Sequence, residues 1–248
     1  DALQINGGVT WNVSQDPTTY ISGVEKLTMN ASTSAMSFTP LATWVTDTSI
    51  TTIDLSGDTN TTGTNVVNLT NLTTTSAVTI TGGAGVDTIT SDAGSASTIQ
   101  GNGGIDIVQL VGTGSVDTLH FAATTDGGAT GDTLANFTVG TDLITVDNTA
   151  FGGTGLAGAI AFTSVAYTIA ESNTLTALTT AAGTDAEGYA VSFDASTIGQ
   201  TLFDAIDTAI AAGSASGPGF VLIDNASHGV LLYDPDFATA TADSTVAL

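Results

Sequence analysis

Gly82-Gly83-Ala84-Gly85-Val86-Asp87-Thr88-Ile89-Thr90 fits the nonapeptide pattern G-G-x-G-x-D-x-U-x, with U apolar, at every defined position. Its glycines allow the backbone to turn tightly and to point its carbonyl groups inward. The aspartate adds a hard anionic oxygen, and the apolar residue begins a short strand. The stretch therefore predicts a tight turn followed by a strand with one buried face.

Three weaker copies of this pattern follow, and their first glycines and aspartates are Gly101 with Asp106, Gly112 with Asp117, and Gly127 with Asp132. Such nonapeptides build parallel β-helices that bind calcium, and each unit forms half a coil. Ligands on stacked turns are then about 18 residues apart. The repeats predict an all-β, parallel β-solenoid with calcium-binding turns.

Asp87 and Asp106 are the best candidates for a shared calcium ion, because they are separated by 106 − 87 = 19 residues. The later spacings, 117 − 106 = 11 and 132 − 117 = 15, are irregular, so Asp117 and Asp132 are either further ligands or ordinary turn residues. Between the first two copies, Ala96 stands where an aspartate is expected, which predicts little metal on the opposite side of the coil. The full candidate set is Asp87, Asp106, Asp117, Asp132 and Asp92, with Gly83, Gly85 and Gly104.

The charge of the chain favours cations as ligands. It has 24 acidic residues and a single basic one, Lys26, which gives a net charge of −23. A compact chain this acidic repels itself unless cations bind, although the charge also suits solubility in a salty medium. Nucleic acid and anionic membrane surfaces are expected to be poor partners, because binding phosphate relies on lysine and arginine.

Composition also limits the class of protein. Cysteine is absent, which excludes disulfides and thiolate metal sites. No segment approaches the apolar length of a membrane span, and the first residues do not look like an export signal. We expect a soluble chain without membrane insertion.

Short alternating segments in the first 80 residues read as strands, at 24–29, 50–55, 65–70 and 77–80. Their expected inward residues are Leu27, Ile53, Leu69 and Ile80, whose spacing shortens from 26 to 16 to 11. This is expected if irregular solenoid coils lead into the glycine turns, and a β-sandwich is the alternative for this part.

Three regions are expected along the chain. Residues 1–80 form solenoid strands, residues 81–148 form the calcium repeats and their closing segment, and residues 149–248 form a β-rich cap. Within the cap, apolar residues at helical spacing predict a helix near 200–212, and segments 219–224 and 229–234 predict a hairpin.

The closing segment, Gly131 to Val146, resembles the D-x-I-x-x-F-x-x-G-x-D-x-I-x-V sequence that ends the repeat arrays of RTX proteins. With the nonapeptides and the terminal G-x-L-x-Y-D segment, the chain from Ile21 onward resembles the C-terminal part of RTX-type surface-layer proteins, which Gram-negative bacteria export by type I secretion. That resemblance implies an extracellular, cell-surface location, calcium-dependent folding and self-assembly into a sheet. By that comparison, we expect the C-terminal export signal of such proteins to lie beyond the end of this chain.

Enzymatic function is not expected. The only histidines are His120 and His228, so the H-E-x-x-H motif of zinc proteases is absent. The nearest match to the G-x-S-x-G motif of lipases has Ala215 in place of the nucleophile, and arginine is absent. His120 is more simply a residue on the surface of a strand.

Two non-enzymatic hypotheses remain. In the first, the chain is a structural subunit that self-assembles with calcium into a surface layer or extracellular fibre, because rows of Thr and Asn favour repeated contacts between identical chains. In the second, it is a calcium-dependent adhesin or glycan-binding module whose partner is a cell-surface polysaccharide. Aromatic residues for such a module are Trp11, Trp44, Tyr20 and Tyr233.

Overall fold

The computed structural model describes two compact units, Asp1–Ile144 and Thr145–Leu248. The described residues of the first unit and its boundary are 1–6, 8, 10–11, 23–40, 50–72, 76–112, 114–127, 132–138 and 141–147. Beyond them, the structure describes the strands at 159–160, 162–169, 188–193, 219–224, 229–234 and 246–247.

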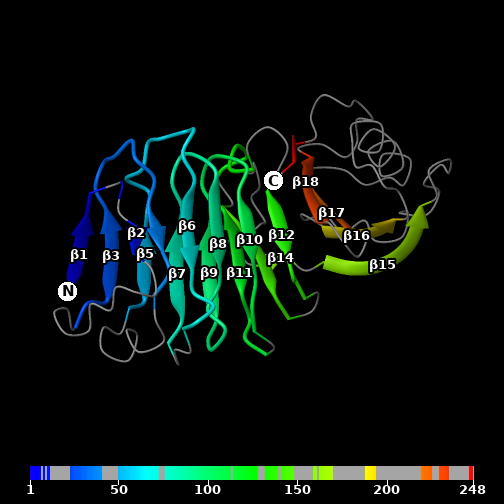
Figure 1. Cartoon of the computed structure of the whole chain (residues 1–248). Helices are drawn as coiled ribbons and strands as arrows, with labels where there is room; N and C mark the ends of the chain where they lie inside the picture. The colour runs from blue at the N-terminus through cyan, green and yellow to red at the C-terminus, as the bar shows by residue number, and fades with distance from the viewer. Residues whose placement is uncertain are drawn as a thin grey trace. The chain divides into compact units, whose positions relative to one another are not determined.

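The first unit contains two sheets, and successive strands of the chain belong alternately to one and the other (Figure 1). One sheet holds the odd-numbered strands β1 (Ala2–Ile5), β3 (Lys26–Met29), β5 (Thr52–Asp54), β7 (Val78–Thr81), β9 (Ser97–Gln100), β11 (Thr118–Phe121) and β13 (Leu143–Val146). The other holds the even-numbered strands β2 (Thr10–Trp11), β4 (Ser37–Phe38), β6 (Asn65–Asn68), β8 (Asp87–Thr90), β10 (Ile107–Gln109) and β12 (Thr133–Ala135).

Pairing within both sheets is parallel. β3 pairs with β1 and β5, and β8 pairs with β6 and β10, each in continuous register. Because the chain passes from one sheet to the other between successive strands, each coil adds one strand to each sheet. This confirms the predicted parallel β-solenoid and excludes a sandwich of antiparallel strands for the first 80 residues.

The interior of the coils is a stack of aliphatic side chains. Leu27, Ile53, Ile80 and Ile99 follow one another in register through the odd sheet, and each has 0% of its surface exposed. Val67, Ile89 and Val108 form the matching stack in the even sheet. Burying such side chains contributes about 1.5–3 kcal/mol each, so these stacks dominate the stability of the solenoid.

The predicted shortening of the inward spacing was wrong, because Leu69 is not in the same stack as its predicted neighbours. Leu69 is buried but follows β6 in the even sheet, where its N–H donates to the Thr90 carbonyl. Within the odd sheet the coil lengths are 53 − 27 = 26, 80 − 53 = 27 and 99 − 80 = 19. The coil therefore contracts only where the first nonapeptide begins.

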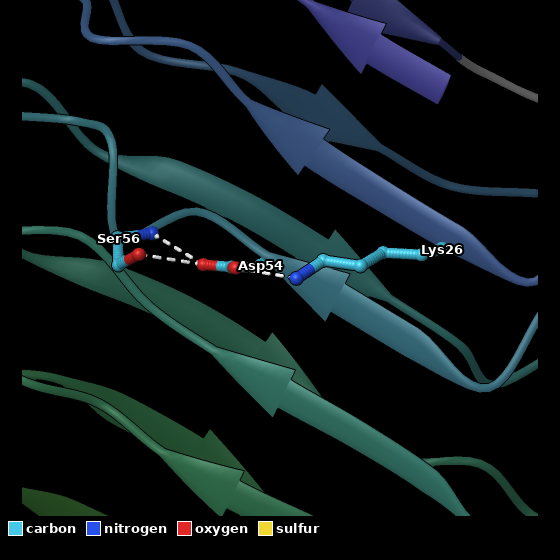
Figure 2. Close-up of polar contacts among 3 residues, drawn as sticks. All are labelled: Lys26, Asp54 and Ser56. Carbon is cyan, nitrogen blue, oxygen red and sulfur yellow. Dashed lines mark hydrogen bonds and ion pairs between the residues drawn. The ribbon is translucent and has the colours of Figure 1, made fainter. Parts of the chain in front are cut away.

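The outer face of the odd sheet carries the one lysine of the chain. Lys26 Nζ lies 3.0 Å from Asp54 Oδ2 on the adjacent strand, and the Ser56 N–H and hydroxyl both donate to Asp54 Oδ1 (Figure 2). Burial raises the pKa of Asp54, but the hydrogen bonds from Ser56 and Lys26 outweigh it and lower that pKa below its ordinary value. The group is an ordinary surface ion pair between adjacent strands, with Asp54 also held by the turn that follows β5.

In the second unit, a five-stranded sheet has the order β15 (Phe162–Ile169), β16 (Gly188–Phe193), β17 (Gly219–Asp224), β18 (Gly229–Asp234) and β19 (Val246–Ala247). β15, β16 and β17 are parallel, and β17 and β18 pair antiparallel from Gly219↔Asp234 to Asp224↔Gly229. The predicted hairpin is confirmed, whereas the helix predicted near 200–212 lies outside the described residues. No helix with the length and apolar character of a membrane span occurs in the part of the chain that the structure describes.

Candidate functional site

A column of polar side chains crosses the even sheet from strand to strand, at the end of the sheet where the strands begin. Asn65 pairs with Asp87, and the pairing of Ile107 with both Thr88 and Thr133 places Asp106 between Asp87 and Asp132. All four are buried. We refer to Asn65, Asp87, Asp106 and Asp132 as the acidic ladder, with one rung on each successive coil.

The rungs are joined by hydrogen bonds between side chain and backbone. The Asp87 N–H donates to Asp106 Oδ1 at 2.8 Å, and the Asp106 N–H donates to Asp132 Oδ1 at the same distance. At the first rung, the Met36 N–H donates to Asn65 Oδ1 at 2.8 Å. Each rung thus satisfies a buried backbone donor of the coil before it, which explains why Asp or Asn recurs at this position.

The second carboxylate oxygen distinguishes Asp106 from Asp87. Asp87 Oδ2 accepts from the Gly83 N–H, and its Oδ1 accepts from Asn65 Nδ2. Asp106 Oδ2 is buried and has no hydrogen-bond partner in the described structure. The residue equivalent to Gly83 is Asn102, which has φ of 66° and donates its side-chain amide to the Gly82 carbonyl instead.

Burial and mutual repulsion oppose the ionisation of these carboxylates. Burial, followed by the charges of Asp132 and Asp87, raises the pKa of Asp106 to about 8. Burial also raises the pKa of Asp132 to about 7 and that of Asp87 to about 6, although backbone hydrogen bonds hold both back. Asp126, in the turn after β11, repels both Asp106 and Asp132. The ladder is therefore a place where negative charge is unfavourable at neutral pH.

A second column crosses the odd sheet in the same way, where the odd-numbered strands begin. The Ser97 N–H donates to Asp117 Oδ1 at 2.8 Å, and the Asp117 N–H donates to Asp142 Oδ1 at 3.1 Å. Asp117 Oδ2 accepts from the Ser91 hydroxyl, so both of its oxygens are bonded. Burial raises the pKa of Asp117, whereas the hydrogen bonds from Ser97 and Ser91 oppose this shift.

The predicted position of the gap in this column was wrong. Ser97, not Ala96, stands in the column, because Thr98 pairs with Thr118 and so places Ser97 beside Asp117. The irregular spacing of 11 between Asp106 and Asp117 arises because these residues belong to opposite sheets. Asp92 is in neither column, since its oxygens accept from the Gly94 N–H and the Ser95 hydroxyl within one turn.

The candidate glycines are explained by the close stacking of turns. Gly104 has φ of 130°, and a Cβ placed there would lie 2.5 Å from the Gly85 carbonyl oxygen. A Cβ on Gly85 would lie 2.3 Å from the carbonyl oxygen of Asn60, one coil earlier. The Gly83 N–H donates to Asp87 Oδ2 in the ladder. These positions need glycine for packing whether or not a metal binds.

Among the buried side-chain oxygen atoms of the described structure, only Asp106 Oδ2 has no hydrogen-bond partner that a calcium ion would have to displace. Among the described residues, no three His, Asp or Glu side chains are placed to hold a metal ion together. Calcium takes 6–8 oxygen ligands, and backbone carbonyls supply part of such a set. Asp106 Oδ2 is a carboxyl oxygen that, once ionised, a cation can bind without breaking a hydrogen bond. The donor chemistry therefore fits at Asp106.

Reasoning from sequence missed two members of these columns, Asn65 and Asp142, and also Asp126, whose charge acts on the ladder. Asn65 is neutral, and the turn before it has a single glycine, Gly63. Asp142 lies in the closing segment, and Asp126 lies outside the defined aspartate position of its repeat. The alternation of the two sheets was the signal that could have found Asn65 and Asp142. His120 lies half-buried on β11, where its neighbours Leu119 and Phe121 face the core.

A scan against protein-family models, a search of curated proteins and a search of solved structures find no match to this chain.

Proposed function

We propose that this chain is an extracellular structural protein of the bacterial cell surface that binds calcium along its solenoid and self-assembles into a surface layer or fibre, without catalytic activity. The observation that carries the proposal is the composition of the acidic ladder. Asn65 accepts the Met36 N–H through the oxygen of a neutral amide, so the ladder's hydrogen bonds do not require charge. Asp87, Asp106 and Asp132 are nevertheless carboxylates on three successive coils.

Carboxylates at these positions weaken the cation-free fold. Replacing an amide by a buried carboxylate adds a desolvation cost and repulsion from the next rung. A buried charge that destabilises the fold usually has a functional role. For a chain with a net charge of −23, the simplest such role is to bind a cation that neutralises the carboxylates. Asp106 would hold the ion with Asp132, and calcium would supply the positive charge that stabilises both in their ionised form.

The architecture favours assembly over binding of a small molecule. Within the described residues, β1 ends the odd sheet, and β2 and β12 end the even sheet. Edge strands of parallel sheets present backbone N–H and C=O groups that a further strand can pair with. Identical chains that meet through such edges, or through their flat outer faces, form open filaments or sheets rather than closed pairs when the contact is head to tail.

Electron microscopy with and without calcium tests the proposal. Negative-stain images of the purified protein in millimolar calcium should show ordered sheets or filaments that dissolve when EGTA is added. Equilibrium dialysis against labelled calcium, run on the same samples, separates binding from assembly. A protein that binds no calcium and stays monomeric under both conditions would sink the proposal.

Two matched variants locate the effect. Asp106→Asn retains an Oδ1 acceptor for the Asp87 N–H but removes the free anionic oxygen, so we expect weaker calcium uptake. Asp54→Asn removes the same charge from the outer face, beside Lys26, and should bind calcium as the wild type does. Equal losses in both variants would show that overall charge, rather than the ladder, attracts the ions.

A further inference from the structure

The chain is rich in a tripeptide that the acidic ladder does not explain. Asparagine is followed two residues later by serine or threonine, without an intervening proline, at seven positions: Asn12, Asn30, Asn60, Asn68, Asn71, Asn136 and Asn225. This tripeptide is the acceptor sequence for N-linked glycans in exported proteins. The structure describes enough of these positions to separate them by geometry.

Asn68 has the geometry that an acceptor needs. It is the last residue of β6, half-buried, and its Oδ1 accepts two hydrogen bonds from Thr70. The Thr70 N–H donates at 3.0 Å and the Thr70 hydroxyl at 2.6 Å. Thr70 and Asn71, which follow in the turn, are exposed. The Asn68 Nδ2 donates to no group among the described residues, so the nucleophilic atom is not engaged.

Asn60 forms the same turn in a more crowded place. The Thr62 N–H and hydroxyl donate to Asn60 Oδ1 at 3.0 and 2.9 Å. Its Nδ2, however, lies against Gly63, where an added Cβ would be only 2.3 Å away. Asp54 and Ser56 repeat the arrangement on the opposite sheet with a carboxylate in place of the amide (Figure 2). The same local turn thus forms at three Asx-x-Ser/Thr sequences, two at strand ends and one in a loop.

Asn136 and Asn30 have the tripeptide but use their amides elsewhere. Asn136 has φ of 64°, and its Nδ2 donates to the Leu110 carbonyl of the preceding coil at 3.0 Å. Asn30 Nδ2 donates to Asn6 Oδ1 at 3.0 Å. An amide nitrogen that holds two coils together is not available as a nucleophile, so Asn136 provides an internal comparison for Asn68.

We propose that Asn68 is a site of N-linked glycosylation, and this proposal does not rest on calcium binding. The two hydrogen bonds to Oδ1 draw electron density toward the oxygen and make the Nδ2 protons more acidic. Nδ2 attacks C1 of a sugar joined to a polyprenyl diphosphate, so that the C–N bond forms as the C–O bond to phosphate breaks. The lipid diphosphate leaves with the bonding electron pair, and one Nδ2 proton passes to a base of the oligosaccharyltransferase.

Peptide mapping by mass spectrometry of the protein isolated from its own cells is the first test. Peptides that contain Asn68 should carry hexose-type mass additions that fragment as glycans, and peptides that contain Asn136 should be unmodified. An unmodified Asn68 overturns the proposal, and so does equal occupancy of Asn136.

A second test isolates the role of the turn. Folded protein made without glycosylation is incubated with a purified single-subunit oligosaccharyltransferase that recognises Asn-x-Ser/Thr and with its lipid-linked sugar donor. The wild type and Thr70→Ser should be modified at Asn68, whereas Thr70→Val, which keeps the shape but lacks the hydroxyl, should not. Asn68→Asp retains the turn, as Asp54 does, and serves as the folded negative control. Modification of Thr70→Val as fast as the wild type would refute the mechanism.

Discussion

Asp106→Asn should stabilise the calcium-free protein at neutral pH, although it alters a buried residue. The asparagine keeps an oxygen that accepts the Asp87 N–H, as Asn65 does for Met36 at the first rung. It removes the carboxylate oxygen that is buried without a partner. Most substitutions at buried positions destabilise a fold, so a gain in stability here would be specific to the electrostatic argument.

The size of the gain follows from the raised pKa of Asp106. In the folded protein, its pKa of about 8 keeps this group protonated at neutral pH, whereas its ordinary value is 3.8. Taking up that proton at pH 7 spans 7 − 3.8 = 3.2 pKa units, or about 4 kcal/mol at about 1.4 kcal/mol per unit. Because Asp132 and Asp87 share the repulsion, and the new amide needs acceptors for its protons, we expect about 2 to 4 kcal/mol.

The pH dependence has the opposite sign to that of most acidic groups. A carboxyl whose pKa is raised by folding binds more protons in the folded than in the unfolded state, so stability falls as pH rises from about 4 to about 8. Each proton contributes a slope of about 1.4 kcal/mol per pH unit within that window. The raised pKa values of Asp87 and Asp132 act in the same direction. Asp106→Asn should therefore reduce the slope of the unfolding free energy against pH by about the contribution of one proton.

Urea unfolding in EGTA, followed by circular dichroism at constant ionic strength between about pH 5 and about pH 8, measures both effects. Asp147→Asn, which removes one charge from an exposed position, controls for the general relief of the acidic net charge. If Asp106→Asn is less stable than the wild type at pH 7, or gains no more than Asp147→Asn, the electrostatic account of the ladder is refuted.

Three further outcomes are expected. Gly104→Ala should cost about 2 kcal/mol or more, because its φ and the nearby Gly85 carbonyl exclude a Cβ, whereas Gly103→Ala, whose Cβ would meet its nearest atom at 3.6 Å, should cost under about 1 kcal/mol by urea unfolding. Lys26→Met should change the free energy of unfolding by less than about 1 kcal/mol, since the ion pair with Asp54 is at the surface, and a larger loss would show a role beyond pairing. Chelation should speed hydrogen exchange in β8, β10 and β12 more than in β3 and β5, and uniform acceleration would argue against calcium in the acidic rungs.

The nonapeptide predicted the local fold well because its signal is local. Glycines mark the turn, and the strand β8 begins at Asp87, the position that the pattern reserves for aspartate. The hairpin of β17 and β18 was also predicted, since both strands and the turn between them are contiguous in sequence.

The assignment of residues to sheets could not be predicted from spacing. Asp106 and Asp117 are 11 residues apart yet belong to opposite sheets, while Asp106 and Asp132 are 26 apart and adjacent. A loop of any length can join two strands of a solenoid, because lengthening a loop changes its closure entropy only slowly. Register depends instead on which residues fill the core, and the sequence offers several equivalent aliphatic choices at each coil.

The tightest coil of the even sheet lies between two rungs of the acidic ladder, and one feature of the sequence sets both the length of that coil and the close approach of those carboxylates. The stacked core residues Val67, Ile89 and Val108 are separated by 89 − 67 = 22 and 108 − 89 = 19 residues, and the shorter coil is the one that joins Asp87 to Asp106. That coil closes in so few residues because glycines allow its turns to stack in direct contact. The same contact leaves no side-chain bulk between successive rungs, so their charges repel at close range. Glycine turns and buried aspartates thus act together. The glycines bring Asp87 close to Asp106, Asp132 on the next coil adds the larger repulsion, and together they create the demand for a cation on which the proposed function rests.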